Sequence, residues 1–261
     1  MKPIEIHMFP CLRDNYGFLL HDAEAGVTAA VDTPEVGPIL AALEEKGWRL
    51  THILNTHHHH DHAGGNLAIK AATGCRIIGP RADSARIPGI DTEVGEGDEF
   101  LLGGHPVRVY DTPGHTRGHI VYYLPEDGVA FVGDTLFTMG CGRLFEGTPQ
   151  QMWTSLQKLM SWPDDTRVYC AHEYTQANAQ FALTVEPGNV ALSRRAHEVD
   201  ALRAANVPTV PTTMGEEKAT NPFLRPMSEE IRSMVGLGGS STAEAGLVDV
   251  FARTRALKDR F

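Results

Sequence analysis

The chain has 261 residues, 42% of them hydrophobic and 21% charged, which is typical of a soluble globular enzyme with one large domain or one domain and an appendage. Its formal net charge of -10 argues against nucleic acid or an anionic membrane as the main partner. No apolar stretch is long enough for a transmembrane helix, and the first residues resemble neither a signal peptide nor a transit peptide.

In chain order, apolar alternation and turn residues predict strands at residues 4–9, 16–20, 27–31, 50–54 and 76–78, with helices at 36–46 and 67–72. For the first helix, Thr33 is the expected N-cap, Pro34 the first helical residue and Gly47 the stop. Residues 80–105 are expected to be irregular. Further strands are expected at residues 107–110, 120–124, 129–132 and 168–170, with a helix that opens at Thr148 and Pro149 and runs to about residue 160.

The pattern changes after Glu173. Helical spacing covers residues 176–184, 190–205 and 243–258, and no further strand pattern is seen. We therefore predict an α/β catalytic domain at residues 1–172 and a smaller helical, substrate-binding domain at residues 173–261.

The four cysteines contain no C-x-x-C pair, which excludes zinc ribbons and thioredoxin-like motifs. We expect free thiols in a reducing compartment, and so a cytoplasmic protein. Histidine is unusually abundant, with 13 residues, and it is the commonest metal ligand and acid/base residue.

Six of the histidines and aspartates stand in one run, His57 to His62, directly after a predicted strand. Alternate residues of an extended chain face the same way, so His57 and His59 can point at one ion. Asp61 and His62 follow as the chain turns toward a helix and can face a second position. Imidazole and carboxylate ligands suit zinc, iron or manganese. The alternatives are a solvated polar loop or a histidine tag, but this run is internal and lies between an apolar strand and a helix.

Three more candidate ligands also follow predicted strands: His115, Asp134 and His172. A single histidine or aspartate at a strand end is more often structural than functional. Together with the first run, however, they supply seven ligands from four strand ends, where rigid strands hold functional groups in place.

At these residues the chain resembles the metallo-β-lactamase superfamily, and within it glyoxalase II, the hydroxyacylglutathione hydrolases. The order H-x-H-x-D-H, His115, Asp134, His172 carries the superfamily resemblance. The match is supported by the segments DNY at 14–16, THHHHDHAGGN, TPGHTRGH, GDTLFTMGCGRLFEG, CAHEYT and NPFLR and by the basic C-terminal end. The metal motifs alone identify only the superfamily, whereas GCGRLFEG, NPFLR and the basic end narrow the resemblance to glyoxalase II. The resemblance covers essentially the whole chain.

The resemblance implies an αββα sandwich followed by a helical domain. It implies two divalent metal ions, zinc with iron or manganese as alternatives, and a metal-bridging hydroxide that hydrolyses S-(2-hydroxyacyl)glutathione thioesters. One metal would be held by His57, His59 and His115, the second by Asp61, His62 and His172, and both by Asp134. Asp61 and Asp134 would be the catalytic residues. The glutathione contacts would be Arg143, Tyr174, Arg255 and Lys258, and the protein would act as a monomer on a small-molecule substrate.

Some positions depart from the family pattern. Phe145 stands where the family has a tyrosine, which leaves one substrate hydrogen bond open, and Ala171 stands where a glycine is usual. His60 is expected to be a surface or supporting residue and not a ligand. The sequence leaves open a persulfide dioxygenase with one iron, a lactonase or β-lactamase, and a metal-binding module without catalysis.

Overall fold

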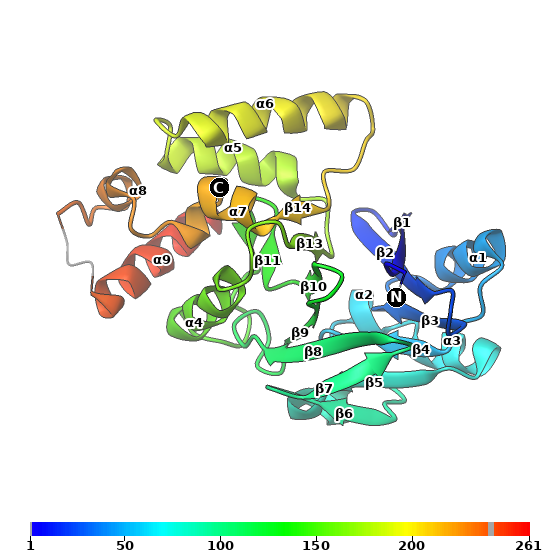
Figure 1. Ribbon diagram of the computed structural model, residues 1–261. Helices are drawn as coiled ribbons and strands as arrows, with labels where there is room; N and C mark the ends of the chain where they lie inside the picture. Colours follow the sequence, from blue (N-terminus) through cyan, green and yellow to red (C-terminus); the bar gives the residue numbers. More distant parts are fainter. Residues whose placement is uncertain (1, 240–242) are drawn as a thin grey trace. The chain divides into compact units, whose positions relative to one another are not determined.

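The computed structural model describes residues 2–239 and 243–261. The chain divides into two compact units, the first formed by residues 1–112 and 116–133 and the second by residues 113–115 and 134–261. These units are defined by internal contacts and differ from the predicted domains, whose boundary after residue 172 stays a prediction. Figure 1 labels the elements of both units.

The first unit contains a six-stranded sheet in the order β1-β2-β3-β4-β5-β6. Its strands are β1 Glu5–Cys11, β2 Asn15–Asp22, β3 Val27–Val31, β4 His52–Leu54, β5 Arg76–Pro80 and β6 Thr92–Val94. β1, β2 and β3 pair antiparallel, whereas β3 to β6 pair in parallel. A second set of strands in this unit is antiparallel: β7 Glu99–Leu102, β8 His105–Asp111, β9 Ile120–Leu124 and β10 Val129–Gly133.

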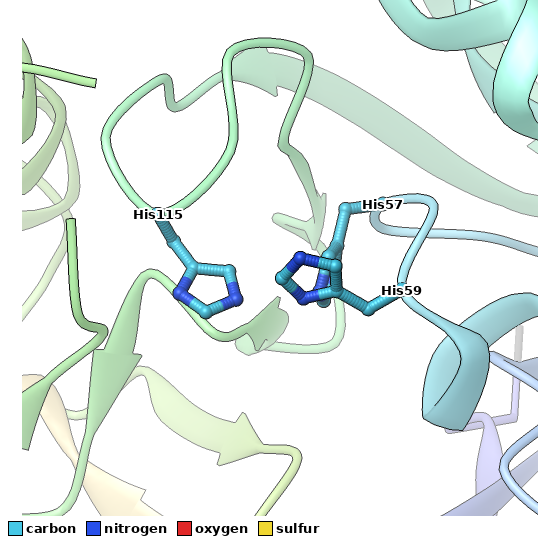
Figure 2. A group of neighbouring side chains, drawn as sticks. All are labelled: His57, His59 and His115. Atoms are coloured by element: carbon cyan, nitrogen blue, oxygen red, sulfur yellow. The ribbon is translucent and has the colours of Figure 1, made fainter. Parts of the chain in front are cut away.

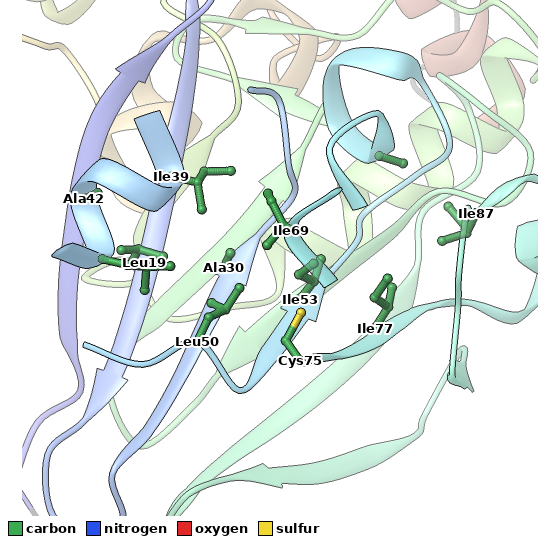
Figure 3. Packing of buried hydrophobic residues seen from close by; sticks show 12 residues of the cluster. Leu19, Ala30, Ile39, Ala42, Leu50, Ile53, Ile69, Cys75, Ile77 and Ile87 are labelled. Carbon is green, nitrogen blue, oxygen red and sulfur yellow. The ribbon is translucent and has the colours of Figure 1, made fainter. Parts of the chain in front are cut away.

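Three helices of the first unit follow strands of the six-stranded sheet: α1 Val36–Lys46, α2 His60–Ala63 and α3 Asn66–Thr73, with the 3-10 helix η1 Arg81–Arg86. The register places Leu19, Ala30, Ile53 and Ile77 side by side in one row across β2 to β5. Figure 3 shows this row packed with Ile39 and Ala42 of α1 and Ile69 of α3. The other face of the sheet meets the second set of strands, as in the ring contact between Phe18 and Phe131. The strands thus have two apolar faces, and their carboxyl ends carry the polar loops.

The second unit contains two pairs of short strands, β11 Leu136–Phe137 with β12 Gly140–Cys141 and β13 Arg167–Cys170 with β14 Thr212–Thr213. Its helices are α4 Pro149–Met160, α5 Thr175–Val185, α6 Val190–Ala204, α7 Met214–Thr220, η2 Pro222–Leu224, α8 Glu229–Met234 and α9 Glu244–Lys258. α4 begins with the capping box of Thr148 and Gln151, and Pro149 is at its start, as the sequence predicts.

Several sequence predictions need correction. Residues 80–105 are not irregular: they form η1, β6 and β7, of which β6 pairs with β5 and β7 forms a hairpin with β8. Thr33 does not cap α1, whose N-cap is Glu35, because the Thr33 hydroxyl binds Asn66 instead. A strand does follow Glu173, since β14 pairs with β13. Gly47 ends α1 in the left-handed conformation, as predicted.

Candidate metal centre

The loop after β4 carries His57 and His59, and α2 starts directly behind it. Its backbone is fixed at both ends, because Asp32 accepts from the Thr56 amide at 2.8 Å and Asn55 Nδ2 donates to the His62 carbonyl at 2.9 Å. His57 is fully buried. The loop therefore presents its imidazoles from a rigid support.

Asp32, at the end of β3, organises the histidine rings through its carboxylate. Besides the Thr56 amide, it binds the Thr56 hydroxyl at 2.8 Å and His62 Nδ1 at 2.8 Å. The Thr56 hydroxyl lies 3.0 Å from His57 Nδ1. A partner on Nδ1 fixes the orientation of an imidazole and directs Nε2 to the opposite side, as around most metal-bound histidines.

The Nε2 atoms of these rings face other candidate ligands. His57 Nε2 lies 3.0 Å from His59 Nδ1, and His62 Nε2 lies 3.6 Å from the Asp61 carboxylate. Asn15 Nδ2 donates to Asp61 at 3.2 Å and orients that carboxylate. Four of the predicted ligands, all in the first unit, thus lie close together: His57, His59, Asp61 and His62.

In the second unit, Asp134 stands between two imidazoles. Its Oδ2 lies 3.3 Å from His115 Nε2, and its Oδ1 lies 3.4 Å from His172 Nε2. His115 Nδ1 is paired with the Arg143 carbonyl at 2.9 Å, which directs Nε2 toward Asp134. Each oxygen of one carboxylate therefore faces a different histidine, the arrangement expected of a ligand shared by two ions.

Three groups of side chains offer ligand atoms that all lie within 4.8 Å of one another: His57, His59 and His115; His57, His62 and Asp134; and Asp61, His62 and His172. Figure 2 shows the first group, with the three imidazole rings turned toward one another. All seven predicted ligands occur in these groups. His60, at the start of α2, is exposed and belongs to none of them. The donor set of imidazole nitrogens and carboxylate oxygens fits a divalent transition metal.

Sequence reasoning missed the residues that support the ligands. Asp32 ends a strand, so the strand-end argument used for His115 could have found it. His119 is buried, pairs with Thr112 Oγ1 at 3.0 Å and stacks on His57. Asp83 lies 3.1 Å from His58 Nδ1, and no local sequence signal connects these two residues.

Of the predicted substrate contacts, Tyr174 lies beside a candidate ligand. Its ring stacks on His172 with centroids 4.7 Å apart and planes 2° apart, and it is 38% exposed. Phe137 meets both rings edge-on, at 5.8 Å from His172 and 5.3 Å from Tyr174. Phe145 is exposed and contacts the His115 ring.

The other three predicted contacts are cations that differ in exposure. Arg143 is exposed, whereas Arg255 is buried, donates to the Cys141 carbonyl at 2.8 Å and pairs with Asp259. Lys258 Nζ donates to the Ala177 carbonyl at 2.9 Å. Burial, followed by the positive charges of Arg255 and Arg143, lowers the pKa of Lys258 to about 8. Lys258 thus lies close enough to Arg255 and Arg143 for their charges to act on it, while Asp259 pairs with both arginines.

Comparison with known proteins defines the class first. A model of the metallo-beta-lactamase superfamily matches residues 20–172, and a model described as "Hydroxyacylglutathione hydrolase C-terminus" matches residues 173–261. Solved structures with the same fold include ETHE1 from Myxococcus xanthus, with 26% identity, 97% of this chain and 99% of that chain covered and a TM-score of 0.66. A second is TTHA1623 in a di-iron-bound form, which has 25% sequence identity and a TM-score of 0.61. The match covers 84% of this chain and 100% of that chain. The fold is therefore the α/β metallo-β-lactamase fold with a C-terminal helical region, as the sequence predicts.

The particular family follows from curated relatives that match over the full length. A hydroxyacylglutathione hydrolase of Methylococcus capsulatus is 55% identical over 99% of both chains. Those of Maricaulis maris and Rhizobium meliloti are each 54% identical over 100% of both chains. The chain belongs to the hydroxyacylglutathione hydrolase family, which confirms the family resemblance seen in the sequence. No helix among the described residues is long and apolar enough to cross a membrane.

Proposed function

We infer that the protein is a metal-dependent hydrolase that converts S-(2-hydroxyacyl)glutathione thioesters, such as S-D-lactoylglutathione, to glutathione and a 2-hydroxy acid. The main support for this inference is that relatives named for this activity match the whole chain. The convergence of the candidate metal ligands agrees with it. A metal-binding module without catalysis explains the ligands, but it does not explain the full-length match to an enzyme family.

We propose that the ligands hold two divalent ions. One ion would bind His57, His59 and His115, the second would bind Asp61, His62 and His172, and Asp134 would bind both. The support is that the two oxygens of Asp134 face different imidazoles. We propose zinc as the metal, with iron or manganese as alternatives, because this donor set accepts all three. The di-iron form of TTHA1623 shows that a relative of this fold holds two iron ions.

A metal ion at this site supplies charge stabilisation for the thioester carbonyl oxygen and lowers the pKa of water from 15.7 to about 7. The residues of the chain fix where this happens. Asp32 and the Arg143 carbonyl pair with the Nδ1 atoms of His62 and His115, which leaves both Nε2 atoms as the ring nitrogens that would bind the metal. Asn15 holds the Asp61 carboxylate in the same way.

In the reaction, a water oxygen forms a bond to the thioester carbonyl carbon, and the carbon–sulfur bond breaks. Glutathione leaves as a thiolate, whose pKa is near that of cysteine, about 8.5, so it needs little protonation to depart. A dedicated general acid is therefore not required, and we assign none. Asp61 and Asp134 are the proposed catalytic carboxylates, because they lie among the ligand atoms.

The glutathione part of the substrate carries two carboxylates and one ammonium group. Since the protein has a net charge of -10, such an anion needs a local group of cations. We propose that Arg143, Arg255 and Lys258 form this group, with Tyr174 beside the reacting centre. This grouping is supported by the pKa of Lys258, which the positive charges of Arg255 and Arg143 lower in addition to burial. Because Arg255 is buried, it would contribute to substrate binding through its positive charge and through the hydrogen bond that it donates to the Cys141 carbonyl.

The test is a comparison of two thioesters with metal-reconstituted protein. S-D-lactoylglutathione should release free thiol with saturation kinetics, whereas a small uncharged thioester should have a much lower kcat/KM. Absence of thiol release from S-D-lactoylglutathione would refute the proposed activity. Oxygen uptake with a glutathione persulfide would instead indicate a dioxygenase.

We further propose that the protein works as a monomer in the cytoplasm. The support for a reducing compartment is that Cys11, Cys75, Cys141 and Cys170 are all unpaired and buried. Light scattering of the purified protein tests the monomer, and cell fractionation tests the location.

A further inference from the structure

The hairpin β11–β12 connects two parts of the proposed site. It starts two residues after Asp134 and ends two residues before Arg143. Its turn is tight, because Met139 has a φ of 54°, in the left-handed region that non-glycine residues rarely adopt. The Met139 side chain is fully buried in a cluster with residues of α5 and α6. Only two residue pairs join β11 to β12, and so short a hairpin is weak by itself. The turn therefore needs support from elsewhere.

That support comes from two polar side chains of α7 and the residue after it. Glu217 Oε2 accepts from the Met139 amide at 2.9 Å and from Asn221 Nδ2 at 2.8 Å. Asn221 Nδ2 in turn reaches the carbonyls of Phe137 at 3.2 Å and Gly140 at 2.9 Å, one on each strand. Glu217 is fully buried, as is Asn221. The carboxylate therefore fixes both the turn and the amide that holds the two strands.

The partners of Glu217 require the charged carboxylate. The Met139 amide, Asn221 Nδ2 and the Thr212 hydroxyl at 2.9 Å all donate to it. Burial raises the pKa of Glu217 to about 7, and these three hydrogen bonds oppose the rise. The titratable groups near it are Glu216 on the same helix, which raises its pKa further, and the Cys170 thiol on β13. Protonation of Glu217 would place a hydroxyl donor beside groups that donate to the carboxylate, and it would weaken the hydrogen bond to the Met139 amide that fixes the turn.

The turn determines the position of Phe137. The ring of Phe137 is buried and meets Tyr174 and His172 edge-on, both at 83°. The contact with Phe137 supports one side of the Tyr174 ring, which also stacks on His172. A shift of the turn would therefore move a ring that packs against both a proposed substrate contact, Tyr174, and a proposed metal ligand, His172.

We propose that Glu217 is a positioning residue for the glutathione substrate: its carboxylate fixes the β11–β12 turn, the turn fixes Phe137, and Phe137 holds Tyr174 in its binding position. This inference rests on the proposed function, in which Tyr174 contacts the substrate. It assigns to Glu217 a role in affinity that goes beyond its role in the packing of the second unit.

The experiment compares Glu217→Gln with the matched control Glu216→Gln in the metal-loaded protein. The control removes the same charge from the neighbouring residue, whose partners are Arg195 and Thr212 and not the hairpin. The readout is the Kd of S-methylglutathione, a thioether that cannot be hydrolysed, measured by titration calorimetry at pH 8. Because a charge-assisted hydrogen bond is lost, we expect the Kd to rise at least about five-fold in Glu217→Gln and to stay within about two-fold in the control.

The pH dependence separates positioning from a purely structural role. The ratio of the Kd of Glu217→Gln to that of the wild type should be largest at pH 8 and fall toward one at pH 6, because Glu217 of the wild type becomes protonated across its pKa of about 7. Lys258, whose pKa is about 8, titrates in both proteins and so cancels in this ratio. Equal Kd values for Glu217→Gln and the wild type at pH 8 would overturn the inference. If the wild type itself does not bind S-methylglutathione, both the inference and the proposed substrate are wrong.

A second variant keeps the inference testable if Glu217→Gln does not fold. Phe137→Leu leaves the hairpin backbone and its hydrogen bonds intact but removes the ring that meets Tyr174. It should raise the Kd of S-methylglutathione several-fold when the variant is compared with the wild type at equal metal content, which elemental analysis verifies because Phe137 also packs against His172. An unchanged Kd would contradict the proposed path from Glu217 to Tyr174.

Discussion

Replacement of Asp32 by asparagine tests how the metal centre is built. The Asp32 carboxylate makes three contacts of 2.8 Å, with the Thr56 amide, the Thr56 hydroxyl and His62 Nδ1. Asparagine keeps the size of the side chain but turns one acceptor into a donor, so one of these contacts becomes repulsive. Loss of a carboxylate that orients a metal-bound histidine typically costs 10- to 100-fold in metal affinity or activity, which is about 1.4 to 2.8 kcal/mol.

The chain offers a matched control for this substitution. Asp127 pairs with the buried His105 Nδ1, also at 2.8 Å, and neither residue belongs to a group of candidate metal ligands among the described residues. Asp127→Asn therefore removes the same kind of buried aspartate–histidine contact, and it should lower thermal stability without changing metal affinity.

Metal affinity is measured by competition of the metal-free protein with a chromophoric chelator, and folding is checked by circular dichroism. We expect Asp32→Asn to bind zinc 10- to 100-fold more weakly than the wild type, in line with the cost of such a loss. Equal affinities of Asp32→Asn and Asp127→Asn would refute the reasoning, because the carboxylate would then stabilise the fold alone.

Three further predictions concern the ligands, the substrate cations and stability. Asp134→Asn should sharply reduce both the metal occupancy and the rate of thioester hydrolysis. His60→Ala should change both little, because His60 is exposed and lies outside the groups of candidate ligands. Equal activities of the two variants would contradict the ligand assignment. The KM for S-D-lactoylglutathione should rise as the pH increases through about 8, because Lys258 loses its positive charge there, and Lys258→Ala should abolish that rise in a KM–pH profile. Removal of metal by a chelator should lower the melting temperature, since ions that bind only the folded state stabilise it; an unchanged melting temperature in calorimetry would speak against metal binding by the folded protein.

The sequence predicts most of what short-range signals encode. The helix Val36–Lys46 and its stop at Gly47 follow from local spacing, and so does the helix that opens at Thr148 and Pro149. The candidate ligands can be picked out of the sequence because each follows an apolar strand. Strands β6 and β7 are not predicted because they have three and four residues, too few for a clear alternation of apolar and polar positions.

The supporting residues could not be predicted because their partners are far away in the sequence. Glu217 contacts Met139 across 78 positions, and Asp83 contacts His58 across 25. The charge of Arg255 gives no signal that its side chain is buried, and nothing in the sequence near Lys258 indicates that its ammonium group reaches the Ala177 carbonyl. Arg255 lies on the same face of α9 as the buried Phe251 and Leu247, four and eight residues earlier, and this explains its burial.

The central claim is that two metal ions held by seven side chains make this chain a thioester hydrolase, and a metal titration of activity tests it most directly. Metal-free protein is mixed with increasing zinc, and thiol release from S-D-lactoylglutathione is measured at each ratio. The account predicts no turnover without metal and a rise in turnover that ends at about two equivalents per chain, as in two-metal hydrolytic sites. Full turnover in the metal-free protein, or no turnover at any zinc, iron or manganese ratio, would contradict it.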